Sequence, residues 1–189
     1  MNLPNRITLG RLVLAAALFA TLELWCRDSE GTGWYVCFGL FIALVISDGL
    51  DGYIARSRNQ ITSFGRIADP FADKILIGGT LVMLTTLPPT RDLAPAWFVI
   101  LVLAREFLVS GLRGYLEGRG VKFAARWEGK AKLVIQAVFC STLLLYPGGR
   151  FEWTLTLAKI GLPVTALVTV WSAISYVRKA AEELGRQDV

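Results

Sequence analysis

Four aspartates lie within 26 residues of a chain that is otherwise strongly apolar. Asp48 and Asp51 directly follow the apolar run GWYVCFGLFIALVIS, and Asp69 and Asp73 precede the run ILIGGTLVMLTTL. Carboxylates at the ends of membrane-length segments are energetically expensive unless they are paired, hydrated or bound to cations. Their number and placement therefore indicate a chemical role rather than a structural one.

Helical spacing allows the four carboxylates to converge. Asp48 and Asp51 are three residues apart, and Asp69 and Asp73 are four apart, so each pair shares one face of a helix. Pro70 suits the first turn of a helix, so we expect a new helix to begin there. The polar stretch between the two pairs, RSRNQITSFGR, predicts a short connection within a helical hairpin.

A cluster of carboxylate oxygens is the kind of site that hard cations prefer. Mg²⁺ is the first candidate, with Mn²⁺ or Ca²⁺ behind it. Four carboxylates on a shared face are enough to make a site for two metal ions plausible. Such ions are commonly shared between carboxylates and phosphate oxygens, so the cluster also points to a substrate that carries phosphates.

The composition identifies the elements that must position these side chains. Of the 189 residues 54% are hydrophobic, and a soluble domain of this length carries less apolar sequence. Six segments approach or exceed the roughly 20 apolar residues that cross a bilayer. We therefore expect an all-α integral membrane protein, with six transmembrane helices in a bundle and one domain over residues 1–189. The first span keeps a short interfacial segment, Leu3–Arg11, and the others lie near residues 34–56, 67–87, 95–116, 133–146 and 154–177.

Lysine and arginine residues orient the predicted bundle. They gather in the N-terminal segment, the second and fourth connections and the C-terminal tail, whereas the opposite side has only Arg27, Arg91 and Arg150. The positive-inside rule then places both termini and the aspartates in the cytoplasm. The net charge of +5 thus belongs to a membrane-facing, phosphate-handling side, and nucleic acid is not expected as a partner.

The chain contains no histidine, which restricts the chemistry available to it. A histidine general base, histidine metal ligands and a Ser-His-Asp triad are all excluded. The three cysteines, Cys26, Cys37 and Cys140, lack metal-ligand spacing and are expected to be buried in packing. Any proton transfer must therefore fall to carboxylates, lysines or tyrosines.

Further polar residues flank the aspartates. Gly52 leaves room for close backbone approach, and Arg56 can reach a phosphate with a fork of donors. Thr62 and Gly65 are expected in the connecting loop. Asn5, Thr8 and Arg11 fall on one helical face at the N-terminus, where they either anchor the chain at the interface or line the rim of the site.

One pattern joins these residues and resembles a known family. The segment fits D-x2-D-G-x2-A-R-x8-G-x3-D-x3-D, with its fixed positions at Asp48, Asp51, Gly52, Ala55, Arg56, Gly65, Asp69 and Asp73. This is the signature of the CDP-alcohol phosphatidyltransferases. The stretches LPNRITLGRLVLA, LAREFLVSGLRGYLEGRGV and GKAKLVIQ are similar to the branch of that family whose acceptor is glycerol 3-phosphate.

The resemblance implies an enzyme of the bacterial inner membrane that usually forms a homodimer among membrane lipids. It implies transfer of the phosphatidyl group of CDP-diacylglycerol to glycerol 3-phosphate, with release of CMP. By analogy two divalent cations, Mg²⁺ or Mn²⁺, are held by Asp48, Asp51 and Asp69, while Asp73 is the general base and touches the second metal. The residues expected to contact CDP-diacylglycerol are Gly52, Arg56 and Thr62, together with Asn5 and Thr8.

A second group of basic residues is expected to bind the acceptor's phosphate. Arg105 lies within the fourth span, Arg113 two turns later, and Lys130 and Lys132 begin the fifth. The alternative is that Arg113 and the lysines only anchor in anionic headgroups. A structural pair between Arg105 and Glu106 is not expected, since adjacent helical residues diverge by about 100°.

Alternative functions are less well supported by the pattern. A cation transporter would carry its charges near mid-bilayer on broken helices, whereas these aspartates lie at span ends beside a basic loop. A sister enzyme that uses inositol phosphate or phosphatidylglycerol cannot be separated by physics alone. Small residues such as Gly78, Gly79 and Gly111 are expected to allow close helix contacts or a dimer interface.

Overall fold

The structure is a computed structural model that describes residues 3–27, 31–57, 63–120 and 127–185, and the side chains of residues 9–27, 31–48, 71–120 and 131–185. All regular structure in these ranges is helical, as the composition predicts. The helices are α1 (Leu3–Trp25), α2 (Thr32–Ser57), α3 (Ser63–Thr86), α4 (Ala96–Gly118), α5 (Trp127–Gly149) and α6 (Glu152–Gly185).

Two of the described helices have both the length and the apolar character of a membrane span. They are the stretch Ala131–Gly149 of α5 and the whole of α6, which is 34 residues long. At about 1.5 Å per residue, α6 is longer than the ~30 Å hydrocarbon core of a bilayer. A shorter apolar stretch, Thr32–Asp48, lies in α2. Crossing of the membrane by any of the six helices stays a prediction.

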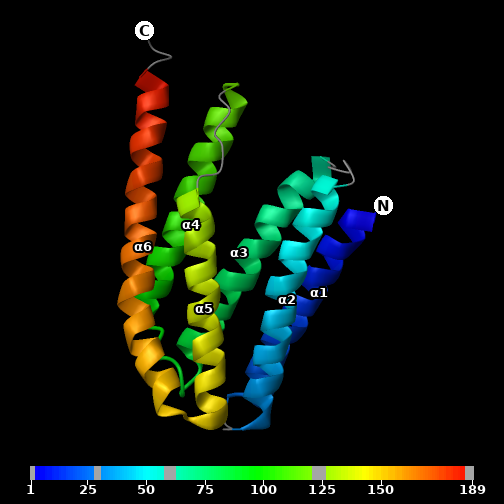
Figure 1. Ribbon diagram of the computed structural model, residues 1–189, viewed down its shortest axis with the longest axis vertical. Helices are drawn as coiled ribbons and strands as arrows, with labels where there is room; N and C mark the ends of the chain where they lie inside the picture. Colours follow the sequence, from blue (N-terminus) through cyan, green and yellow to red (C-terminus); the bar gives the residue numbers. More distant parts are fainter. Residues whose placement is uncertain (1–2, 28–30, 58–62, 121–126, 186–189) are drawn as a thin grey trace.

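The helices pack into one elongated bundle in which α1 begins and α6 ends at the same end (Figure 1). Helix α1 packs on α2 and α3, α5 packs on α2 and α6, and α4 packs on α6. The main core contains buried side chains such as Leu18, Phe41, Leu81, Phe98 and Leu143. The three cysteines are also buried, as expected from the sequence, and none of them forms a disulfide.

A smaller apolar cluster continues beyond the main core. It joins α4 to α6 through Val109, Leu116, Tyr176 and Ala180. In Figure 1 the two helices extend past the ends of α1, α2 and α3 on the side where α6 ends. The bundle is therefore uneven at this end, where α4 and α6 reach beyond α1–α3.

The start of α3 differs from the prediction. Helix α3 begins at Ser63, so Pro70 lies inside the helix and not in its first turn, and Gly65 is helical and not part of a loop. Proline removes one backbone donor from a helix, but membrane helices tolerate it where neighbouring groups satisfy the freed carbonyl. The consequence for the site is that Asp69 and Asp73 stand one turn apart on a single continuous helix.

Two adjacent glycines set how closely α3 approaches its neighbours. A Cβ atom at Gly78 would lie 2.8 Å from Leu103 Cδ2 of α4, and one at Gly79 would overlap the ring of Phe19 of α1. Gly111, in contrast, would meet no atom within 4 Å among the described residues. The prediction of close helix contacts is thus confirmed for the α3 pair only.

Candidate active site

Arg11 joins the first and last aspartates of the sequence pattern. Its Nη2 atom lies 2.6 Å from Asp48 Oδ1 and 3.0 Å from Asp73 Oδ1. The arginine side chain is 5% exposed, whereas those of Asp48 and Asp73 are 25% and 29% exposed. Residues from α1, α2 and α3 therefore meet in one ionic cluster, which we call the aspartate cluster. Asp48 and Asp73 come together although 25 residues separate them in the chain.

The other predicted members can be placed only along the backbone. Asp51 lies one turn after Asp48 in α2, and Asp69 lies one turn before Asp73 in α3. Side chains outside the described set are those of Asp51, Gly52, Arg56 and Asp69, of Asn5 and Thr8 in α1, and of Lys130 in α5. Thr62 lies outside the described residues altogether. Among the described side chains, no three carboxylates, cysteines or histidines converge to hold a metal.

A small cavity lies beside the two described aspartates. Its volume is about 30 Å³ and its walls come from α2, α3 and α5. The lining residues are Val45, Asp48, Asp73, Leu76, Ile77, Leu133 and Ala137. A cavity of this size holds about one water molecule. The two carboxylate oxygens already converge on a single positively charged nitrogen, so their arrangement and hard-oxygen chemistry fit a cation.

A second ionic cluster lies between α4, α5 and α6. Arg105 Nη1 lies 3.1 Å from Glu106 Oε1, and Lys132 of α5 also pairs with Glu106 Oε1. Arg105 Nη2 donates to Ser172 Oγ at 2.5 Å, and the guanidinium carbon lies 5.3 Å from the centre of the Tyr176 ring. Arg105 is 6% and Lys132 5% exposed. We call this group the basic cluster.

The pair between Arg105 and Glu106 corrects a prediction. Adjacent helical residues diverge at Cβ, but the long stem of arginine allows its guanidinium to bend back towards the neighbouring carboxylate. Lys132 contacts the same Oε1 atom of Glu106, so one carboxylate serves two cations. The predicted basic residues Arg105 and Lys132 are thus brought together by Glu106, which was not expected to pair with Arg105.

Arg113 lies two turns beyond Arg105 on α4. Its Nε atom is buried and has no hydrogen-bond partner among the described residues. Within the part of the chain that the structure describes, this donor is therefore available to a ligand.

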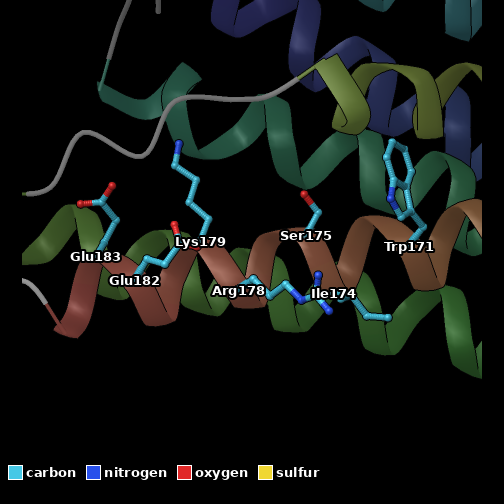
Figure 2. Close-up of a pocket in the computed structure, with 7 residues that line it drawn as sticks. All are labelled: Trp171, Ile174, Ser175, Arg178, Lys179, Glu182 and Glu183. Atoms are coloured by element: carbon cyan, nitrogen blue, oxygen red, sulfur yellow. The ribbon is translucent and has the colours of Figure 1, made fainter.

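A larger cavity of about 530 Å³ lies along the C-terminal half of α6. Its described lining comes from Trp171, Ile174, Ser175, Arg178, Lys179, Glu182 and Glu183, of which Figure 2 shows Trp171, Ser175 and Lys179 projecting from the same side of the helix. Two cations and two carboxylates stand together in this lining. None of the residues predicted from the sequence is among its described lining.

The ionic partners of Arg11 and the contacts that Glu106, Ser172 and Tyr176 make with Arg105 could not be foreseen from the sequence. One signal for Arg11 was present, because an arginine beside the apolar run LVLAAALF needs a counter-charge, and the aspartates at the span ends could supply it. No such signal exists for Ser172 and Tyr176, whose contact with Arg105 spans 67 residues in the case of Ser172. That contact depends on how α4 and α6 are packed.

Comparison with known proteins places the chain among lipid-modifying enzymes. The family model described as CDP-alcohol phosphatidyltransferase matches residues 1–171. A Bacillus subtilis (strain 168) protein named CDP-diacylglycerol--glycerol-3-phosphate 3-phosphatidyltransferase is 38% identical over 192 residues, covering 97% of each chain. The match to the family model includes the whole aspartate pattern.

Relatives with the same printed name occur in other lineages. The protein from Rickettsia bellii (strain RML369-C) is 33% identical over 178 residues, which is 94% of each chain. The Arabidopsis thaliana protein named CDP-diacylglycerol--glycerol-3-phosphate 3-phosphatidyltransferase 2 is 33% identical over 191 residues, covering 95% of this chain and 79% of its own length. The similarity therefore extends over almost the whole chain in each case.

Proposed function

The chain belongs to the CDP-alcohol phosphatidyltransferase family, and from this premise we propose that it transfers the phosphatidyl group of CDP-diacylglycerol to glycerol 3-phosphate. The observation that carries the proposal is the similarity, over 97% of both chains, to a protein named for that reaction. A bond forms between the acceptor hydroxyl oxygen and the β-phosphorus of CDP-diacylglycerol. The bond from this phosphorus to CMP breaks, CMP leaves, and the hydroxyl proton passes to the enzyme.

The aspartate pattern is proposed to handle the phosphates and the proton. Members of this family generally depend on divalent cations, and two such ions, Mg²⁺ or Mn²⁺, would be held by Asp48, Asp51 and Asp69, with Asp73 at the second. When bound, the ions supply positive charge that offsets the charge gathering on the phosphates. Asp73 accepts the proton of the acceptor hydroxyl, a role that a positioned carboxylate can fill in a chain without histidine.

The basic cluster is proposed to bind the phosphate of the acceptor. Arg105 and Lys132 together carry two positive charges against the one negative charge of Glu106, which leaves a charge for an anion. Leu133, next to Lys132, lines the cavity beside Asp48 and Asp73, so α5 links the two clusters. Arg113 and Lys130 are proposed as further donors to the same phosphate.

The remaining assignments extend this proposal. Gly52, Arg56 and Thr62, with Asn5 and Thr8, contact CDP-diacylglycerol. The six helices cross the bacterial inner membrane as one domain, with both termini and the site in the cytoplasm. The enzyme acts as a homodimer. The end of the bundle where α1 begins and α6 ends would then face the water-soluble acceptor (Figure 1).

The test is a CMP-release assay on the purified chain with CDP-diacylglycerol and a panel of acceptors. Glycerol 3-phosphate, inositol phosphate, phosphatidylglycerol and serine are compared with Mg²⁺, with Mn²⁺ and with a chelator. Fast release is expected with glycerol 3-phosphate and either metal, and loss of release with the chelator. A preference for another acceptor would contradict the proposed substrate, and activity without metal would contradict the proposed mechanism.

A further inference from the structure

Arg11 occupies the position between two carboxylates that the proposed function gives to a divalent cation. We propose that Arg11 is an internal counter-cation, which holds Asp48 and Asp73 together and exchanges with the divalent cation when that ion binds. The inference rests on one part of the proposed function, namely that Asp48 and Asp73 bind a metal ion. It concerns a positioning residue, since Arg11 acts through the two aspartates.

The contacts of Arg11 are those of an exchangeable ion pair. One nitrogen atom, Nη2, serves both carboxylates, at 2.6 Å and 3.0 Å. Nε is buried and has no hydrogen-bond partner among the described residues. The fork-to-fork pairing that makes arginine–carboxylate pairs strong is therefore not used with either aspartate. The guanidinium offsets one of the two negative charges without pairing in a fork with either aspartate.

Charge balance gives the direction of the exchange. Arg11 brings one positive charge to two carboxylates, whereas a divalent cation brings two. A small hard cation also accepts oxygen atoms from both carboxylates at shorter distances than a guanidinium does. Asp48 and Asp73 are both more exposed than Arg11 and border a cavity of about 30 Å³. An ion can therefore approach them from the cavity side while the arginine withdraws.

The first experiment measures Mn²⁺ binding to the purified chain by electron paramagnetic resonance, without substrate. Arg11→Gln is expected to bind Mn²⁺ about tenfold more tightly than the wild type, because the competing cation is gone. Arg11→Lys, which keeps the charge, is expected to stay within about threefold of the wild type. Arg91→Gln serves as the matched control, since Arg91 is 63% exposed and lies in the turn between α3 and α4.

The second experiment needs no variant, so it holds even where Arg11→Gln folds poorly. Phenylglyoxal modification of the wild type is followed by peptide mass spectrometry with and without Mn²⁺. Modification of Arg11 is expected to rise several-fold when Mn²⁺ is added, because the displaced guanidinium leaves its buried position. Arg105, which is held in the basic cluster, is the internal reference and is expected to stay unchanged.

The outcomes separate the exchange from the metal site itself. Unchanged or weaker Mn²⁺ binding in Arg11→Gln, or Mn²⁺-independent labelling of Arg11, would overturn the exchange while leaving the metal site intact. Asp48→Asn is expected to lose Mn²⁺ binding. If neither the wild type nor Arg11→Gln binds Mn²⁺, the exchange and the metal assignment are both wrong.

Discussion

The aspartate cluster and the basic cluster are built from the same parts in opposite proportion. In the aspartate cluster one guanidinium faces two carboxylates, and in the basic cluster one carboxylate faces a guanidinium and an ammonium. The first set has a negative charge left over and the second a positive one. Helices α1–α3 thus supply a site that suits cations, and helices α4–α6 supply one that suits anions.

The two clusters also differ in how firmly their arginines are held. Arg105 contacts Glu106, Ser172 and the Tyr176 ring, which come from two helices. Among the described side chains, Arg11 contacts Asp48 and Asp73 through a single nitrogen. A guanidinium with several different partners is oriented before a ligand arrives, and pre-organisation favours binding of a phosphate. On the proposed function, the basic cluster would be a fixed anion site and the aspartate cluster a cation site whose occupant can change.

The largest expected effect is that of Asp73→Asn on the aspartate cluster. An amide has nearly the shape of the carboxylate but cannot accept the hydroxyl proton, and general-base catalysis contributes about 10²–10⁴-fold. CMP release is expected to fall by a factor in that range, with the thermal stability of the purified protein preserved. The matched control is Asp92→Asn, because Asp92 is 91% exposed and remote from both clusters in the turn after α3. Retention of more than about a tenth of the activity in Asp73→Asn would remove Asp73 as the base.

A smaller effect is expected from Arg105→Lys in the basic cluster. Lysine keeps the charge but loses the planar fork that reaches Glu106 and Ser172 at once. Hydrogen bonds to charged groups contribute about 1.5–3 kcal/mol, so the KM for glycerol 3-phosphate is expected to rise roughly tenfold or more. The KM for CDP-diacylglycerol is expected to stay within about twofold.

Steady-state kinetics with each substrate varied in turn checks this difference. Ser172→Ala removes only one partner of Arg105, so a rise in the acceptor KM smaller than that of Arg105→Lys is expected. Equal changes in both KM values would show that the basic cluster is not specific for the acceptor. The contrast between a cation-binding and an anion-binding half would then be wrong.

The helices were predictable because each consists of a long apolar run between polar connections. The same rules misplaced the start of α3, since proline is statistically favoured in the first turn of a helix, and here the helix begins at Ser63, before Pro70. Local propensity is weaker than the packing of a whole helix against its neighbours. A proline inside a membrane-length helix is therefore not a reliable marker of where the helix begins.

The part of the site that follows from helical spacing within short segments was predictable from the sequence. Asp48 and Asp73 each lie in a helical segment of one predicted hairpin, so their convergence could be foreseen. In the structure both contact the guanidinium of Arg11. The bond of Arg11 to Asp73 spans 62 residues, and no local rule pairs them. The prediction that Arg105 and Glu106 would not pair was wrong for another reason. The Cβ directions of adjacent helical residues diverge, but the long arginine side chain reaches back to the neighbouring carboxylate. The proposed roles of all four aspartates stay predictions.

The smallest expected effects concern the two adjacent glycines of α3. One lies against α1, which belongs to the half with the aspartate cluster, and the other lies against α4, which belongs to the half with the basic cluster. Gly79 faces Phe19 of α1, and Gly78 faces Leu103 of α4. Overpacking costs about 1–3 kcal/mol, and an aromatic ring yields less easily than the end of a leucine, so Gly79→Ala is expected to lower the unfolding free energy more than Gly78→Ala. Gly111→Ala, which meets no described atom within 4 Å, is expected to leave it unchanged or slightly higher.

These substitutions also test whether α3 holds the two halves independently. Gly79→Ala shifts α1 against α3 and hence Arg11 against Asp73, so Mn²⁺ affinity is expected to change while the acceptor KM does not. Gly78→Ala shifts α4 against α3, so the acceptor KM is expected to change while Mn²⁺ affinity does not. Thermal unfolding, Mn²⁺ titration and acceptor kinetics on the three alanine variants measure all of these quantities. If both α3 variants changed both properties equally, the clusters would form one coupled site, because a shift at either face of α3 would then reach both.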